Sequence, residues 1–143
     1  MTPDPFKNFR FLVEIDRIVQ AGFSDCTGLG SSVEVIEYRE GGDPSHVRKL
    51  PGKTSYPNIV LKWGITFSRE LYDWHRSVIQ GNPKPLIHRN GSILLIGEEG
   101  VERDRWNFYG AWPSVWKGPD FSGLGKDVAI ESLTLACERI ERA

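Results

Sequence analysis

The chain has 143 residues, with 18 basic and 19 acidic side chains and a formal net charge of −1 at pH 7. This length is sufficient for one domain to bury a core without disulfides or metals, and the balanced charge disfavours a general binder of nucleic acid or anionic membranes. No apolar run approaches the ~20 residues of a membrane span, and the polar start MTPDPFKNFR lacks the apolar region of a signal peptide. We therefore expect a single domain over residues 1–143, synthesised in the cytoplasm.

Short β-rich runs separated by turn residues predict a mainly antiparallel β protein. Residues 10–16 alternate between apolar and polar side chains, as does the run over residues 59–67. Residues 21–27 and 32–39 flank the sequence Gly28-Leu29-Gly30, so we expect these two runs to form a hairpin.

The connector over residues 36–57 is too long for an ordinary hairpin loop. Connections in compact domains usually have about 2–5 residues, and those beyond roughly 12–15 are uncommon unless they bind something or are disordered. Interleaved charges of both signs, with glycines and prolines, favour an extended arm with defined bends at about residues 38–56. The candidate partner-contacting residues of this arm are Tyr38, Arg39, Glu40, Gly41, Gly42, Asp43, His46, Arg48, Lys49, Leu50, Pro51, Gly52 and Lys53.

One helix is predicted, at about residues 69–80. Ser68 is a candidate N-cap, Leu71, Trp74 and Val78 recur at helical spacing, and Gly81-Asn82-Pro83 ends the run. A single short helix with an apolar stripe is expected to cover one open end or face of a β structure.

The C-terminal half contains further β-rich runs. Residues 93–96 are apolar on both faces of any strand, so cover on both sides is expected, one cover being another subunit. Asn90-Gly91-Ser92 is interpreted as a turn, and Glu98-Glu99-Gly100 as another that leads into a strand over 103–111. Residues 127–140 fit either a helix or a strand, and the β context favours a strand.

No catalytic, metal or cofactor site is expected. The histidines His46, His75 and His88 share no motif, and the two cysteines, Cys26 and Cys137, are interpreted as buried reduced thiols. The GLGK sequence at 123–126 lacks the first glycine and the Ser/Thr of a phosphate-binding loop.

The aromatic residues of the C-terminal half leave one alternative open. Tryptophans on a β-sandwich can stack on sugars, so Trp112 and Trp116 are compatible with a monomeric carbohydrate-binding domain. Core packing is favoured, because a small two-sheet core needs large apolar side chains.

Several segments resemble a known family in their order and spacing. They are FRFLVEID at 9–16, AGFSDCTGLGS at 21–31, IEYREGG at 36–42, VRKLPGKTSYPNIVLKWGIT at 47–66, RWNFYGAWPSVWKGPDF at 105–121 and VAIESLTLA at 128–136. Together they closely resemble the tail tube proteins of contractile injection systems and phage tails.

This resemblance implies two packed antiparallel sheets that form a barrel-like sandwich with one flanking helix. It also implies a structural, non-enzymatic subunit of hexameric rings that stack into the inner tube, with a lumen for cargo effectors. Two hairpins at about 21–39 and 89–111 would join a ring-wide sheet, and the arm would reach neighbouring subunits and the next ring. The implied partners are other copies, sheath subunits, baseplate or spike proteins and tube-terminating proteins.

Site residues follow from the same resemblance. The candidate lumen-facing residues are Ser32, Glu34, Arg103, Arg105 and Asn107. The candidate sheath-facing residues of the helix are Arg69, Asp73 and Arg76. A tube-initiating ring at the baseplate and a type VI secretion tube remain alternatives.

Overall fold

The structure, a computed structural model, describes residues 10–16, 18–20, 23–39, 41–42, 46–64, 69–81, 87–120, 123 and 129–143. Several residues of the sequence predictions lie outside these ranges: Phe9, Glu40, Asp43, Ile65, Phe67, Ser68, Asn82, Pro83 and residues 124–128.

Apart from β4 (Ser32–Tyr38) and β5 (Arg48–Ser55), which form a separate two-stranded sheet, the described strands form two antiparallel sheets that share one long strand, β8 (Glu102–Lys117). The first sheet contains β2 (Ile18–Gln20), β1 (Arg10–Ile15), β7 (Arg89–Ile96), the first part of β8, and β10 (Arg139–Arg142) on its other edge. The second contains the last part of β8, then β9 (Ile130–Ala136), β6 (Ile59–Gly64) and β3 (Phe23–Thr27). The predicted mainly β architecture of two sheets is therefore confirmed.

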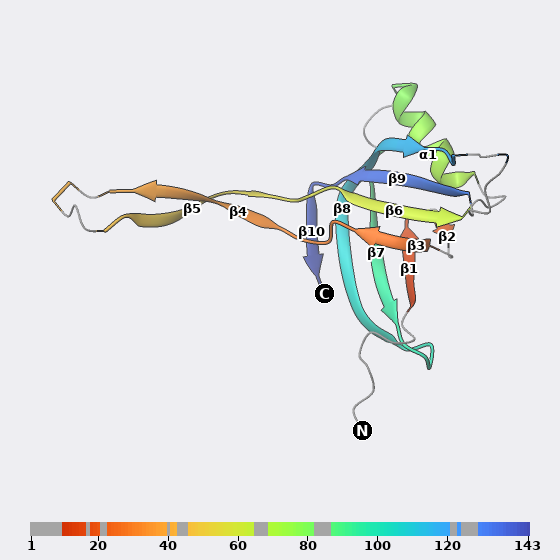
Figure 1. Cartoon of the computed structure of the whole chain (residues 1–143), viewed down its shortest axis with the longest axis horizontal. Coiled ribbons are helices and arrows are strands. Elements are labelled where there is room, and N and C mark those ends of the chain that lie inside the picture. Colours follow the sequence, from red (N-terminus) through yellow and green to blue (C-terminus); the bar gives the residue numbers. More distant parts are fainter. Residues whose placement is uncertain are drawn as a thin grey trace.

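The long strand β8 changes sheets at Gly110. Residues up to Ala111 pair with β7 and β10, and those from Trp112 onward pair with β9. Gly110 has φ of 59°, a left-handed conformation that glycine adopts without steric cost. Its N–H donates to the side-chain oxygen of Asn90 at 3.0 Å. As a result, β1 and β7 run across the direction of β6 and β9 in Figure 1.

The core lies between the two sheets. It contains inward residues from the strands of both sheets and two side chains from the helix. Its fully buried large members are Trp63, Trp74, Phe108, Ile59, Leu61, Leu71, Leu133, Leu135 and Pro113. The ring centroids of Phe11 in β1 and Phe23 in β3 are 6.5 Å apart. β1 and β3, which lie at or next to opposite ends of the strand order, therefore approach each other, although none of the pairings among the described strands closes the barrel.

The helix α1 (Glu70–Ile79) confirms the predicted helix and covers one end of the core, beside the last part of β8 (Figure 1). Leu71 and Trp74 are buried, and the indole N–H of Trp74 donates to the Ile87 carbonyl at 2.6 Å. Arg69 occupies the N-cap position without a side-chain capping hydrogen bond.

The hairpin predicted over residues 21–39 is wrong. β3 pairs with β6, whereas β4 (Ser32–Tyr38) pairs with β5 (Arg48–Ser55). Gly28, with φ of 94°, lies against the backbone at Asn58, where a Cβ would overlap the Asn58 carbonyl oxygen. Gly28 therefore permits a close approach to the backbone at Asn58, thirty residues later in the chain, rather than a turn between β3 and β4.

The turn predicted at Asn90-Gly91-Ser92 is also wrong. These residues lie within β7, where Gly91 pairs with Ile15 and with Phe108. A Cβ on Gly91 would overlap both the Glu14 carbonyl oxygen and the Phe108 ring. Glycine is required here because the aromatic ring packs directly over the strand backbone. The ambiguous run at 127–140 forms strands in its described part, as the β context predicted.

Cys26 and Cys137 are free thiols that pack against the core. Burial raises the pKa of the Cys26 thiol from 9.0 to about 11 and the pKa of the Cys137 thiol to about 12. Because both pKa values are raised in the folded state, the neutral thiols contribute stability that is complete below pH 9 and is lost as the pH rises through 11 to 12.

We therefore predict slow alkylation of both thiols in the native protein at pH 8, because few thiolates form there and burial restricts access. In urea both cysteines should react at the rate of a free thiol. The measurement is mass spectrometry after timed labelling. Equal rates in the native and unfolded protein would contradict the burial of these thiols.

Candidate assembly surfaces

The hairpin of β4 and β5, residues 32–55, projects from the two-sheet body as a two-stranded ribbon (Figure 1). Every residue of β4 is exposed, and in β5 only Gly52 is partly buried. The hairpin nevertheless carries large apolar side chains in the open. These are Val33, Val35, Ile36, Tyr38, Val47 and Leu50.

The hairpin has apolar side chains on both of its faces. Ile36 pairs with Leu50, and Tyr38 pairs with Arg48; these four residues define the Ile36 face. Val35 pairs with Pro51, Val33 with Thr54 and Glu37 with Lys49; these six residues define the Val35 face. Since adjacent strand residues point to opposite faces, no single contact can cover both Val35 and Ile36.

The predicted arm residues lie on this hairpin wherever the structure describes them. Tyr38, Arg48, Lys49, Leu50, Pro51, Gly52 and Lys53 are in its strands, and Arg39, Gly41, Gly42 and His46 are near its tip. The strands begin at Ser32 and end at Ser55, so the hairpin starts earlier than the predicted 38–56. A Cβ on Gly52 would meet the Ile36 Cδ1 at 2.9 Å, so the small residue provides room for Ile36 on that face.

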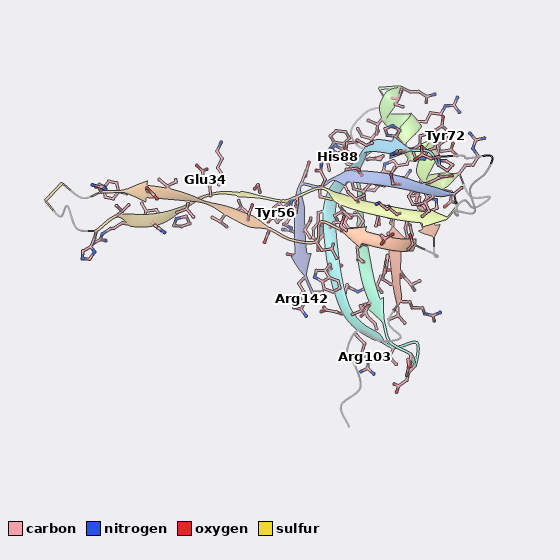
Figure 2. All side chains as sticks on the ribbon, in the orientation of Figure 1. Glu34, Tyr56, Tyr72, His88, Arg103 and Arg142 are labelled. Carbon is pink, nitrogen blue, oxygen red and sulfur yellow. The ribbon has the colours of Figure 1, made fainter. Side chains whose placement is uncertain are left out.

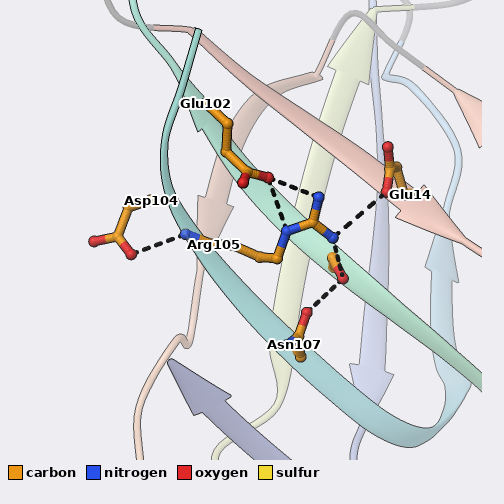
Figure 3. A network of polar contacts seen from close by, with 6 residues as sticks. Glu14, Glu102, Asp104, Arg105 and Asn107 are labelled. Carbon is orange, nitrogen blue, oxygen red and sulfur yellow. Dashed lines mark hydrogen bonds and ion pairs between the residues drawn. The ribbon is translucent and has the colours of Figure 1, made fainter. Parts of the chain in front are cut away.

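A polar network lies on the face of the first sheet opposite the core (Figure 3). Arg105 of β8 contacts Glu102 Oε1 at 2.7 Å and Glu14 of β1 at 3.8 Å, and it donates to Ser92 Oγ of β7 at 3.3 Å. Ser92 donates to Asn107 at 2.6 Å. A single guanidinium thus connects three strands and has carboxylates on two of them.

Two neighbouring basic residues are also paired with carboxylates. Arg103 lies 3.6 Å from Glu99, and Arg142 of β10 bonds Asp104. The side-chain hydrogen bond from Arg142, aided by the backbone N–H of Arg105, lowers the pKa of Asp104 below its usual range. The Arg142–Asp104 pair lies on the other face of β8, where the Arg142 guanidinium is over the Trp106 ring. On the polar face itself, Arg105 and Arg103 each lie beside a carboxylate, so this face presents both charges close together rather than a field of one sign.

The five predicted lumen residues are not brought together. Arg103, Arg105 and Asn107 lie in β8, whereas Ser32 and Glu34 lie in β4. In Figure 2, Glu34 is on the projecting hairpin and Arg103 is near the turn between β7 and β8, at the far side of the body.

The predicted sheath-facing residues lie on or next to α1. Asp73 and Arg76 are exposed on the helix, and Arg69 precedes it with its guanidinium 5.4 Å from the Tyr72 ring centroid. The Tyr72 ring packs edge-on against Trp116, with centroids 4.8 Å apart. Tyr72 therefore occupies a flank of Trp116 that a stacked sugar would need.

The described part of the chain contains no cluster of three or more metal-ligating side chains. The three histidines have different surroundings. His75 of α1 forms a hydrogen bond with the Pro113 carbonyl at 3.0 Å, and His88 lies 3.5 Å from Glu138. His46 is exposed near the hairpin tip. Within the same described ranges, no helix has the length and apolar character that a bilayer crossing needs.

Comparison with protein families identifies one match. The T4-like virus tail tube protein family, gp19, matches residues 7–141. No match is found among curated proteins.

Solved structures give the same result. A chain of the extracellular contractile injection system PVC sheath-tube complex in the extended state is 28% identical, with a TM-score of 0.83 over 99% of this chain and 91% of that chain. A chain of the PVC sheath/tube terminator structure is 29% identical, with a TM-score of 0.82 over 100% and 98%. Hcp1 from Salmonella typhimurium, at 14% identity, has a TM-score of 0.53 over 94% and 85%, a likeness of fold alone.

The family match covers nearly the whole chain, and the chains of the two injection-system structures share its fold. The chain therefore belongs to the T4-like tail tube protein family, and it is a structural, non-enzymatic tube subunit of the kind that contractile injection systems use.

Proposed function

We propose that the subunit forms hexameric rings that stack into the inner tube of a contractile injection particle acting outside the cell. The observation that carries this proposal is the exposed apolar β4–β5 hairpin on a member of a tube family. A two-stranded ribbon is marginal by itself in water, so such a hairpin needs cover from a partner. A contact that repeats between identical chains makes rings when the rotation closes and filaments when it does not, and a stacked tube needs both.

Ring closure is supported by the free edges of the first sheet. At one end, β2 pairs with β1 only at Val13–Ile15; at the other, β10 pairs only with β8 among the described strands. Because β1 and β10 are antiparallel within the sheet, the β10 edge of one copy meets the β1 edge of the next in antiparallel orientation. Such pairing would continue the sheet around the ring and remove the exposed edges.

The polar face of this continuous sheet would line the lumen, with Arg103, Arg105 and Asn107 among its residues. Paired charges support this placement, because a surface without a strong field of one sign does not retain a passing effector protein by its charge. The exposed residues Asp73 and Arg76 of α1, with Arg69, would face the sheath. Further proposed partners are the baseplate or spike and the tube-terminating proteins; the subunit itself would be made in the cytoplasm.

Among the alternatives, the main tube of an extracellular particle is favoured over a type VI tube. The higher identity and TM-score belong to structures of the extracellular system, whereas the Hcp proteins share only the fold. A subunit of a tube-initiating ring at the baseplate would use the same surfaces as a main tube subunit and would differ only in the proteins that it contacts. Genes for a sheath, spike and baseplate beside this one would support the extracellular particle, and genes for membrane-anchored components would support a type VI system.

The test is electron microscopy of the purified protein. We expect rings of six subunits, and short tubes at high protein concentration. A protein that stays strictly monomeric at high concentration contradicts the proposed function.

A further inference from the structure

The seam between two neighbouring copies would join two short free strand edges of the first sheet. On one edge, β2 pairs with Val13–Ile15 of β1 and leaves the stretch from Arg10 to Leu12 open. On the other edge, β10 offers Arg139–Arg142, which pair with β8 alone among the described strands. Edges as short as these can pair in very few registers.

The backbone hydrogen bonds decide which peptide groups point to these free edges. The Asp16 N–H donates to a carbonyl of β7 at 2.9 Å, and peptide groups alternate between the two sides of a strand, so the peptide group of Phe11 points away from β7. The Ala143 N–H donates to a carbonyl of β8 at 2.9 Å, so by the same alternation the peptide group of Ile140 points away from β8. Phe11 of one copy can therefore exchange backbone hydrogen bonds with Ile140 of the next.

The side chains of the two edges agree with this pairing. Phe11 and Ile140 both pack against the core, so they lie on the same face of the joined sheet. Arg10 and Glu141 are their neighbours along each strand and lie on the opposite, polar face. With Phe11 opposite Ile140 in antiparallel strands, Arg10 stands directly opposite Glu141.

We propose that Arg10 of one copy forms an ion pair with Glu141 of the neighbouring copy, and that this pair fixes the register of the seam. The inference rests on the proposed function, because it names the contact that closes the ring. A joined sheet by itself leaves the register of its edges undetermined. The occupant of each edge is a second copy, because the two edges of this one chain complement each other in strand direction, polarity and charge.

Both charged groups are available for this contact. Arg10 is exposed and forms no ion pair with a carboxylate among the described residues, whereas Arg105 on the same face has two. The Glu141 side chain is 49% exposed. It accepts from the Tyr109 hydroxyl at 2.8 Å and lies 3.8 Å from the Arg139 guanidinium, and both contacts use Oε1. Its Oε2 can therefore accept from a further donor.

The neighbouring registers are disfavoured. A shift by two residues in one direction places Arg10 opposite Arg139, and like charges directly opposite each other are destabilising. A shift by two in the other direction requires Ile140 to pair with Val13, whose edge is already occupied by β2. A shift by one residue turns the polar side chains of β10 to the core face. The free edges and the charges therefore select the pairing of Arg10 with Glu141.

The first experiment exchanges the two charges. Arg10→Glu and Glu141→Arg are purified separately and as a double variant, in which an ion pair of opposite sense is restored. The control is the double variant Arg10→Glu with Glu99→Arg, which has the same net charge but places the new cation in the turn between β7 and β8. Sedimentation velocity and electron microscopy measure the fraction of protein in rings, and thermal unfolding monitors the two-sheet body.

We expect each single reversal to lower the fraction in rings at least tenfold with the body folded. One exposed ion pair contributes little, but a ring of six contains the seam six times, and each seam would become repulsive. The exchanged double variant should recover to within about threefold of the unsubstituted protein, and the control double variant should stay low. Normal assembly of both single variants, or no greater recovery by the exchange than by the control, would overturn the ion pair.

A second experiment measures the register without changing the ion pair. In the proposed register Leu12 stands opposite Arg139 of the next copy, within the distance that a disulfide spans. Leu12→Cys with Arg139→Cys should therefore give, after mild oxidation, a ladder of up to six linked subunits on a non-reducing gel. Leu12→Cys with Glu141→Cys measures the register shifted by two residues, and Leu12→Cys alone controls for the native cysteines.

The cross-linking also separates this inference from the proposed function. Stronger linkage with Glu141→Cys than with Arg139→Cys, or rings in which neither pair is linked, would overturn the register while leaving the ring intact. Failure of the unsubstituted protein to form rings at high concentration would contradict the proposed function itself.

Discussion

Reversing both Arg48 and Lys49 to glutamate is expected to abolish tube formation while leaving the subunit folded. Both residues are exposed in β5, and they point to opposite faces of the hairpin. The double change removes two positive charges and adds two negative ones, so the net charge of each hairpin changes by −4. The reversal at position 49 also places like charges opposite Glu37, which is destabilising across a strand pair. The core lies in the two-sheet body, so its free energy of unfolding should change by less than about 0.5 kcal/mol.

Electron microscopy and urea unfolding measure the two effects separately. The matched control is the double variant Arg69→Glu and Arg76→Glu, which makes the same charge change at exposed positions of the α1 surface. In the absence of sheath this control should still form tubes. Full-length tubes from the Arg48 and Lys49 variant would show that the hairpin does not join subunits.

The second large effect is expected at Gly91, where alanine should destabilise the fold by about 3 kcal/mol, at the upper end of overpacking substitutions. The added methyl group would overlap the Glu14 carbonyl oxygen of β1 and the Phe108 ring of β8. Neither neighbour can move freely, because one is backbone in a paired strand and the other is a fully buried core residue.

Urea unfolding monitored by tryptophan fluorescence measures the loss at Gly91. Gly42→Ala is the control, since a Cβ at Gly42 meets nothing within 4 Å. An unfolding free energy for Gly91→Ala within about 0.5 kcal/mol of the unsubstituted protein, the range of ordinary surface changes, would contradict the close packing described for β7.

Local sequence patterns predicted the elements that have clear periodicity. The alternation around Val13 predicted β1, the spacing of Leu71 and Trp74 predicted α1, and the strand predicted over 103–111 is the first part of β8. These patterns require only near neighbours in the chain, so one sequence is sufficient to show them.

Strand pairing was predictable only where the pairing strands are consecutive. The turn predicted at Glu98-Glu99-Gly100 joins β7 to β8, and their pairing agrees with the hairpin at about 89–111 that the family resemblance implied. β3 instead pairs with β6, more than thirty residues away. A pattern of polarity gives no information on such a distant partner, and the glycines at 28 and 30 were misread as a turn between neighbours.

The first strand of the hairpin, β4, was predicted from the run at 32–39, but the segment that forms β5 was interpreted as an arm and not as a strand. β5 contains Pro51, Gly52 and three cations, a composition typical of a loop. One signal was available: Val33, Val35 and Ile36 give β4 apolar side chains on both faces, the same pattern that predicted cover for residues 93–96. Gly91 gave no such signal, because Asn-Gly is common in turns and the position of the Phe108 ring is visible only in three dimensions.

The most direct test of the central claim is a cryo-EM reconstruction of the assembled protein. The account predicts rings of six subunits in a stacked tube, with each hairpin in contact with another copy and with Arg105 facing the lumen. A tube in which the hairpin contacts no neighbouring copy, or in which the polar network of Arg105 is turned away from the lumen, would contradict it.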